Sequence, residues 1–138
     1  MPLAGSCMCG AIKYESSSDP AVTALCHCTD CQKWTGGPYT SNAVVPADSF
    51  QVTQGTPTHY DVTGASGKNN RHFFCSTCGS SLYTKLDVME GMVVIKAGGL
   101  DNGGAALGNK IAVEFYCKDR VPYAAPVEGA KQESHFGS

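Results

Sequence analysis

Seven of the eight cysteines in this chain fall into three tight clusters, and their thiols are the groups best suited to chemistry. Zinc holds thiolate sulfurs in a tetrahedron, which places two bound sulfurs roughly 3.7 Å apart. A C-x-C or C-x-x-C segment can bring two sulfurs that close with modest curvature of the backbone. The clusters therefore predict metal binding. They are Cys7 and Cys9; Cys26, Cys28 and Cys31; and Cys75 and Cys78.

Two other uses of clustered cysteines fit the spacing poorly. A disulfide between Cys7 and Cys9, or between Cys26 and Cys28, would strain the preferred geometry of the bond. A thioredoxin-like C-x-x-C needs a β-α-β setting with the motif at a helix N-terminus, and no such pattern follows Cys75. Metal binding remains the favoured interpretation.

The seven clustered cysteines divide naturally into four ligands and three. A closed structural zinc site takes four protein ligands, whereas a catalytic site takes three and keeps one position open. The two pairs, Cys7/Cys9 and Cys75/Cys78, would form the structural site. Cys26, Cys28 and Cys31 would form the open one. Closing a loop of about 70 residues costs about 4 kcal/mol, well below the roughly 10–16 kcal/mol of structural zinc binding.

Other polar residues could change the assignment of the three-cysteine site. His27 could complete it as a fourth ligand, although an extended backbone would point its ring away. A side chain distant in sequence, such as His59, or His72 or Asp30, could also close the site and make it structural. His27, Asp30 and His72 are also candidates for proton transfer. Cys117 stands alone in an apolar segment and is predicted to be a buried core thiol.

The elements that must position these cysteines are predominantly β-strands. Apolar segments with partial alternation are separated by glycine-rich and polar stretches, which indicates a mainly β fold with little helix. A short helical turn is expected at 29–34, and the tail after Arg120 is expected to be extended. The chain is predicted to be one domain, 1–138, with a core of about 3–123. The predicted strands are 11–15, 21–26, 41–45, 50–53, 58–62, 71–75, 81–85, 92–98 and 111–117.

Composition narrows the class of partner and the compartment. The net charge is −2 and only 16% of residues are charged, which argues against nucleic acid or an anionic membrane as partner. The longest apolar run, Met92–Ile95, is too short to span a membrane, and residues 1–15 do not resemble a signal peptide. We expect a cytoplasmic protein with reduced thiols. Exposed strand edges would permit a homodimer.

Three segments resemble the signatures of a known family. GSCMCGAIKY, CHCTDCQKWTGG and FFCSTCGSSLY are similar, in order and spacing, to those of the glutathione-dependent formaldehyde-activating enzyme family, which also includes centromere protein V. VEFYCKDRVPY resembles the weaker C-terminal signature. The resemblance implies a zinc-stabilised Mss4-like β fold. It also implies the same division of ligands, with a structural zinc on the two cysteine pairs and a catalytic zinc on Cys26, Cys28 and Cys31.

The activity implied by the resemblance is that of a carbon–sulfur lyase. Such an enzyme interconverts S-hydroxymethylglutathione with glutathione and formaldehyde. An open zinc position suits this chemistry because it stabilises a thiolate at neutral pH. The predicted cofactor is zinc, two ions per chain with the second labile, and the predicted partner is a small-molecule thiol or thiol adduct.

Candidate substrate contacts lie close to the three-cysteine cluster in sequence. Lys33 and Arg71 could attract the carboxylates of glutathione, and Trp34 and Tyr39 could form walls beside the zinc. Two alternatives remain open. The first is a non-catalytic zinc module that binds a protein partner, although this chain has no basic arms. The second is a specialised enzyme acting on another small molecule, which an apolar pocket around Trp34 and Tyr39 without cationic anchors would favour.

Overall fold

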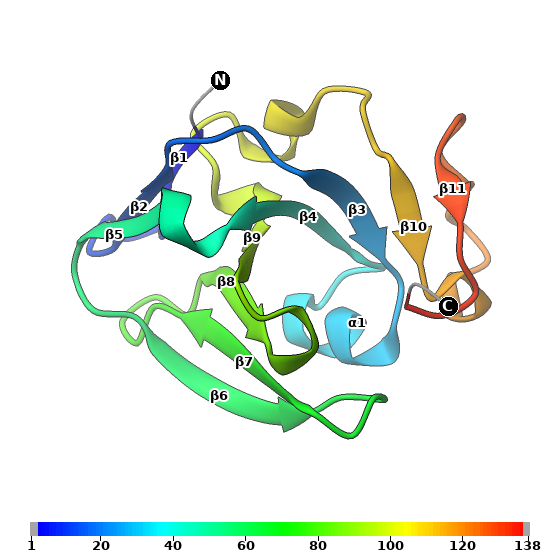
Figure 1. Ribbon diagram of the computed structural model, residues 1–138, viewed down its shortest axis with the longest axis horizontal. Helices are drawn as coiled ribbons and strands as arrows, with labels where there is room; N and C mark the ends of the chain where they lie inside the picture. Colours follow the sequence, from blue (N-terminus) through cyan, green and yellow to red (C-terminus); the bar gives the residue numbers. More distant parts are fainter. Residues whose placement is uncertain (1–2, 137–138) are drawn as a thin grey trace.

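The computed structural model describes residues 3–136, which form two β-sheets and one α-helix, α1 (Thr29–Thr35). The small sheet has the order β1–β2–β5 and the large one the order β11–β10–β3–β4–β9–β8–β7–β6. Figure 1 shows β6 and β7 at one end of the large sheet and β10 and β11 at the other. The strands are β1 (Leu3–Ser6), β2 (Lys13–Ser16), β3 (Val22–Cys26), β4 (Thr40–Pro46), β5 (Phe50–Gln54), β6 (Thr58–Thr63), β7 (Asn69–Phe74), β8 (Ser81–Leu86), β9 (Met92–Lys96), β10 (Val113–Phe115) and β11 (Lys131–Gln132).

The core lies on one face of the central strands of the large sheet. The register pairs Ala43 with Ile95 and Val45 with Val93, and each of these four side chains is fully buried. Because successive residues of a strand point to opposite faces, the even-numbered residues of β4 and β9 face away from this core. Tyr14 of β2 packs into the core from the small sheet. The two sheets therefore share one apolar interior.

The predicted mainly β fold with little helix is confirmed, with differences at the ends of elements. Two short strands, β1 and β11, were not expected, because neither has an alternating apolar pattern. The predicted strand 111–117 spans only Val113–Phe115. It stops because Tyr116 adopts a left-handed backbone conformation (φ 56°) and a 3₁₀ turn, Cys117–Asp119, follows. The other 3₁₀ turns are Ala47–Ser49, Asp87–Met89, Ala97–Gly99 and Gly103–Leu107.

The C-terminal tail lies against β10, which in turn pairs in parallel with β3. A fully buried carboxylate, Glu114, holds it there. Its Oε2 accepts hydrogen bonds from the Val127 N–H and from Gln132 Nε2, both at 2.7 Å. Its Oε1 lies 2.7 Å from His27 Nε2 and 3.2 Å from Arg120 Nη2. Burial opposes ionisation of Glu114, but these donors outweigh it and lower its pKa to about 2.

The prediction of a buried core thiol at Cys117 is wrong. The residue is only partly buried because it lies in the 3₁₀ turn after β10, beside the tail. Its Sγ donates to the Glu114 carbonyl oxygen at 3.3 Å and accepts from Arg120 Nη2 at 3.4 Å. It belongs to the contacts that fasten the tail. Among residues 3–136 the structure has no helix long and apolar enough to cross a membrane.

Candidate functional site

Four cysteine sulfurs from the two ends of the first eighty residues meet in one cluster. Cys7 and Cys9 follow β1 of the small sheet, and Cys75 and Cys78 follow β7 of the large sheet. The four Sγ atoms all lie within 4.8 Å of one another, with Cys7 and Cys9 at 3.6 Å and Cys9 and Cys75 at 3.8 Å. These two separations match those of thiolates that share a zinc ion. The four-sulfur cluster therefore fits a metal and joins the two sheets.

Backbone N–H groups surround the sulfurs of this cluster. Ile12 N donates to Cys7 Sγ at 3.3 Å, and Thr77 N donates to Cys75 Sγ at 3.4 Å. Gly79 adopts the positive φ (77°) expected from the CSTCG turn. Hydrogen bonds from the side chain and backbone of Ser80 lower the pKa of Cys78 to about 5. These donors favour the thiolate at Cys7 and Cys78, and the thiolate is the form of cysteine that binds a metal.

Three further sulfurs meet where β3 runs into α1. Cys26 ends β3, Cys28 is the N-cap of α1, and Cys31 lies in the first turn. Their Sγ atoms lie within 4.8 Å of one another, and Cys28 Sγ accepts a hydrogen bond from Cys31 N at 3.3 Å. The helix start thus turns C-x-C-x-x-C into a three-sulfur cluster. Within residues 3–136, no histidine or carboxylate joins this group.

Within this cluster, neighbouring thiols raise the pKa of Cys26 and Cys28. Hydrogen bonding from the other two stabilises the Cys31 thiolate, so the pKa of Cys31 falls although burial opposes this. Hydrogen bonding with Cys28 and then with Cys31, together with burial, raises the pKa of Cys26 well above its usual range. A divalent cation bound by all three sulfurs would offset the repulsion between their negative charges. The donor set is therefore suited to a thiophilic metal such as zinc.

The structure keeps the other polar candidates out of the three-sulfur cluster. His27 is buried, and its ring binds Glu114 on the side of the C-terminal tail. His59 pairs with Asp61 at 2.8 Å on the surface of β6. His72 and Asp30 line the cavity beside the cluster without joining the sulfurs. His72 Nδ1 lies 2.9 Å from Thr84 Oγ1.

A cavity of about 570 Å³ opens beside the three-sulfur cluster. Its floor is the face of the large sheet opposite the core, and valine, leucine, methionine and phenylalanine side chains make up much of its wall. We call it the sulfur cavity. Its lining includes Val22, Ala24, Cys26, Cys28, Cys31, Asn42, Val44, His72, Thr84, Leu86, Val88, Met89, Val94, Lys96 and Phe136.

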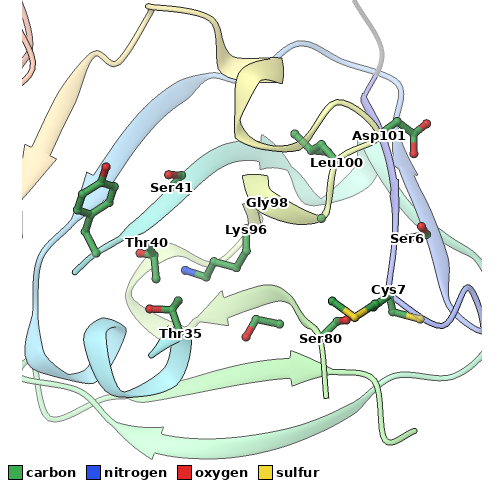
Figure 2. Close-up of a pocket in the computed structure, with 14 residues that line it drawn as sticks. Ser6, Cys7, Thr35, Thr40, Ser41, Ser80, Lys96, Gly98, Leu100 and Asp101 are labelled. Atoms are coloured by element: carbon green, nitrogen blue, oxygen red, sulfur yellow. The ribbon is translucent and has the colours of Figure 1, made fainter. Parts of the chain in front are cut away.

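A second cavity, of about 680 Å³, lies on the side of the four-sulfur cluster and is rich in hydroxyl groups. We call it the hydroxyl cavity. Its lining includes Cys7, Thr35, Thr40, Ser41, Ser80 and Lys96. Figure 2 shows the Lys96 side chain reaching toward Thr35 and Thr40. Lys96 also lines the sulfur cavity, so this residue forms part of the wall of both.

Sequence reasoning missed Lys96, which is buried at the end of β9. Its Nζ donates to Asn42 Oδ1 at 2.6 Å and lies 5.6 Å from the centre of the Trp34 ring. Burial lowers the pKa of Lys96, and the thiolates of the three-sulfur cluster, Cys31 first, oppose that shift. The available signal was a lysine that closes the apolar run MVVIK, because a lysine so placed needs a polar partner.

The residues predicted to contact substrate do not lie together in the structure. Tyr39 lines the hydroxyl cavity, with its ring edge-on to His27 at 5.3 Å. Trp34 packs on His72, with ring centres 4.4 Å apart, and lines neither cavity. Lys33 is exposed on α1 outside both cavities. Arg71 Nη2 lies 2.8 Å from Asp87 Oδ1, so the positive charge of Arg71 is already paired with that carboxylate.

The chain resembles known proteins along most of its length. The family model described as "Glutathione-dependent formaldehyde-activating enzyme" matches residues 2–119. A Halomonas elongata protein named "Putative glutathione-dependent formaldehyde-activating enzyme" is 35% identical over 88 residues, covering 60% of this chain and 55% of that protein. A Schizosaccharomyces pombe protein named as an uncharacterized lyase is 25% identical over 79 residues, covering 57% of this chain and 54% of that protein. The chain therefore spans about half the length of the curated relatives it matches.

The fold also has a counterpart among solved structures. The crystal structure of a Rhodobacter sphaeroides protein superposes with a TM-score of 0.61 at 22% identity, covering 78% of this chain and 96% of that one. This match bears on the fold alone, and it agrees with the β architecture expected from the three cysteine motifs. The matched residues 2–119 hold all seven clustered cysteines. On this ground the chain belongs to the glutathione-dependent formaldehyde-activating enzyme family.

Proposed function

We propose that the protein is a zinc-dependent carbon–sulfur lyase that acts on thiol adducts of aldehydes, such as S-hydroxymethylglutathione. The observation that carries the proposal is a three-sulfur cluster on the wall of a cavity that also holds the buried amine of Lys96. Three thiolates leave one position of a tetrahedral zinc for substrate. The family to which the chain belongs supports the same class of substrate.

In this proposal the two clusters bind zinc for different purposes. The four-sulfur cluster is the structural site, and the three-sulfur cluster is the catalytic site with the more labile ion. Zinc at the three-sulfur cluster would supply Lewis acidity and favour the thiolate form of the substrate sulfur. The donor sets support this division, because four thiolates complete a tetrahedron and three do not.

The chain's own residues would act on the oxygen and proton of the adduct. In the lyase direction the carbon–sulfur bond breaks and its electron pair goes to sulfur, while the hydroxyl loses its proton and becomes the carbonyl. Lys96 Nζ, held by Asn42, would donate a hydrogen bond to that oxygen as charge develops there.

A proton acceptor is available in the same cavity. Of the three candidates for proton transfer, His27 is committed to Glu114, whereas His72 and Asp30 line the sulfur cavity. Burial and the neighbouring Lys96 charge lower the pKa of His72, which favours the neutral imidazole that can accept a proton. With Nδ1 beside Thr84, we assign Nε2 of His72 as the atom that accepts the hydroxyl proton.

The activity is tested by following exchange of formaldehyde with glutathione by nuclear magnetic resonance. The zinc-loaded protein should accelerate exchange over the buffer rate, and Cys28→Ser should abolish the acceleration. Cys117→Ser is the matched control because Cys117 belongs to neither cluster. Exchange at the buffer rate with fully loaded protein would overturn the proposed activity.

The division of the metal sites is tested separately by metal analysis. We expect two zinc ions in the unmodified chain and one in Cys28→Ser, which should remain folded. Cys75→Ser should lose the fold, because the four-sulfur cluster joins the two sheets. If Cys28→Ser unfolds as severely as Cys75→Ser, the three-sulfur cluster is structural too.

A second candidate function is favoured by one observation. Lys96 and Lys118 line the sulfur cavity, but its walls are otherwise largely apolar, which suits a small molecule other than a highly charged peptide thiol. This candidate predicts that the protein binds zinc at both clusters but accelerates no exchange with glutathione. The same resonance experiment, repeated with uncharged thiols such as 2-mercaptoethanol, separates the two.

A further inference from the structure

The floor of the sulfur cavity is organised in rows by the register of the large sheet. Val22 pairs with Val44, and Val44 pairs with Val94, so three valines on adjacent strands form one apolar row. All three line the cavity. A second, more polar row lies on the same three strands, on the side toward α1. That row is Ala24, Asn42 and Lys96, which the same register sets side by side.

The two rows give the cavity a polar end and an apolar end. The polar row lies next to the three-sulfur cluster, because Cys26 is the next residue of β3 on the same face after Ala24. The valine row lies farther along the strands from those sulfurs. A substrate whose sulfur and oxygen are held at the polar row would therefore place its remaining atoms over valines.

Further apolar side chains close the far end of the cavity without sealing it. Leu86 of β8 and Val88 and Met89 of the turn after it line the wall. Val22 and Val88 keep 36% and 38% of their surface exposed. Apolar side chains at the mouth of a lined cavity are available to a ligand, and burying them would release free energy.

The cavity is large enough for a whole thiol adduct, because about 570 Å³ is within the range of pockets that enclose ligands of several hundred daltons. Its valine row lies farther along the strands from the three-sulfur cluster than the polar row does.

We propose that the apolar end of the sulfur cavity is a binding subsite for the carbon chain or ring of an aldehyde, so that the preferred adducts are hemithioacetals of alkyl or aryl aldehydes. This inference rests on the proposed lyase function and names its substrate class. The step needs no oxidant or reductant. R–CH(OH)–S–R′ gives R–CHO and R′–SH as the carbon–sulfur bond breaks, its electron pair stays on sulfur, and the hydroxyl proton is transferred to the sulfur.

Binding without turnover tests the subsite first. S-alkylglutathiones from methyl to hexyl place an alkyl chain where the aldehyde carbon would lie and cannot undergo the reaction. Calorimetry on the zinc-loaded chain should show affinity rising about threefold to fourfold per methylene until the cavity is filled. A parallel series of S-alkyl-2-mercaptoethanols gives the same measurement without the peptide of glutathione.

Matched variants locate the effect. Val22→Ser with Val88→Ser should flatten the dependence on chain length in both series, because both side chains line the apolar end. Val62→Ser on β6 lies outside the cavity lining and should leave the dependence unchanged. Affinity that does not rise with chain length in either series, or a rise that the double variant leaves intact, would overturn the subsite.

Turnover separates the subsite from the lyase function. With glutathione as thiol, kcat/KM for the hexanal hemithioacetal should exceed that for the formaldehyde adduct at least tenfold. Turnover of the formaldehyde adduct with no gain for hexanal would keep the lyase function and refute the subsite. A chain-length dependence in binding with no turnover of any adduct would keep the subsite and refute the lyase function.

Discussion

At the scale of single residues, Lys96 places an amine in a buried position beside the three-sulfur cluster. Burying an ammonium group is costly unless charges or hydrogen bonds compensate for the lost water. Here Asn42 Oδ1 accepts from it, the Trp34 ring faces it, and the thiolates of the three-sulfur cluster favour its charged form. These contacts support the role proposed for Lys96 at the substrate oxygen.

Replacing Lys96 by methionine tests this role. Methionine keeps most of the apolar stem but removes the hydrogen bond to the substrate oxygen, so kcat should fall roughly 100-fold to 1,000-fold. Lys85→Met is the matched control, because Lys85 is exposed on β8 and lines neither cavity. Steady-state kinetics with circular dichroism as a check of folding measures the effect, and an unchanged kcat would exclude the assigned role.

A second residue-scale prediction concerns Glu114. Glu114→Gln should lower the free energy of unfolding by about 3 kcal/mol near pH 7, because Arg120 loses its buried countercharge. The pKa of Glu114 is about 2 in the folded chain and near 4.3 in an unfolded one, so the ionised group stabilises the fold fully above about pH 5. This contribution disappears as the pH falls toward 2.

Urea unfolding at pH values from 8 down to 4 checks that prediction. The difference between the unmodified chain and Glu114→Gln should be constant above about pH 5 and begin to shrink below it. A difference that grows as the pH falls would contradict the lowered pKa. Asp61→Asn serves as control, since that carboxylate is exposed on β6 beside His59.

At the scale of elements, the approach of β1 to the loop after β9 depends on glycine. A side-chain carbon on Gly5 would lie 2.5 Å from both the Gly99 carbonyl oxygen and the Tyr14 hydroxyl. Gly5 also forms a bridge with Leu100, and Asp101 N donates to the Ala4 carbonyl oxygen at 2.9 Å. Because Cys7 follows directly after β1, this contact positions half of the four-sulfur cluster.

Gly5→Ala should therefore weaken the fold and the structural metal site together. We expect a loss of roughly 1–3 kcal/mol in the free energy of unfolding, since the contacts are with backbone and with the buried Tyr14 ring and cannot relax easily. Gly37→Ala is a suitable control, because there the nearest atom is Thr35 Oγ1 at 3.7 Å. Equal thermal unfolding midpoints for the two variants would contradict the close packing of β1.

At the scale of the whole molecule, the four-sulfur cluster crosses between the two sheets while the three-sulfur cluster lies within one. Cys7 and Cys9 extend from the small sheet and Cys75 and Cys78 from the large one. The other cluster joins only β3 to the helix that follows it. Loss of metal from the two sites should consequently have different effects on the fold.

Titration with a chelator tests that difference. The ion at the three-sulfur cluster should leave first with little change in circular dichroism, because three ligands and an accessible cavity favour its release. Removal of the second ion should coincide with loss of β structure, since structural zinc contributes free energy of folding. Release of both ions in one step without unfolding would show that neither cluster holds the sheets together.

Local spacing was enough to predict the cysteine clusters and most strands, because both depend on neighbours in sequence. Lys96 and Asn42 were not predicted as a pair, since their contact depends on the register of β9 against β4. The pairing of His27 with Glu114 depends on a parallel contact between β3 and β10, which are separated by most of the chain. Lys33 was proposed from its nearness in sequence to Cys31, but α1 directs it to solvent.

Because the four-sulfur cluster joins segments far apart in the sequence, it also affects the order of events during synthesis of the chain. Cys9 and Cys75 are 66 residues apart, and ribosomes add roughly 5–20 residues per second. About 3 to 13 seconds therefore pass between synthesis of the first cysteine pair and synthesis of its partners. Cys7 and Cys9 spend that interval as thiols without a completed metal site. The speed of translation thus sets how long these two sulfurs are open to oxidation or to a wrong partner.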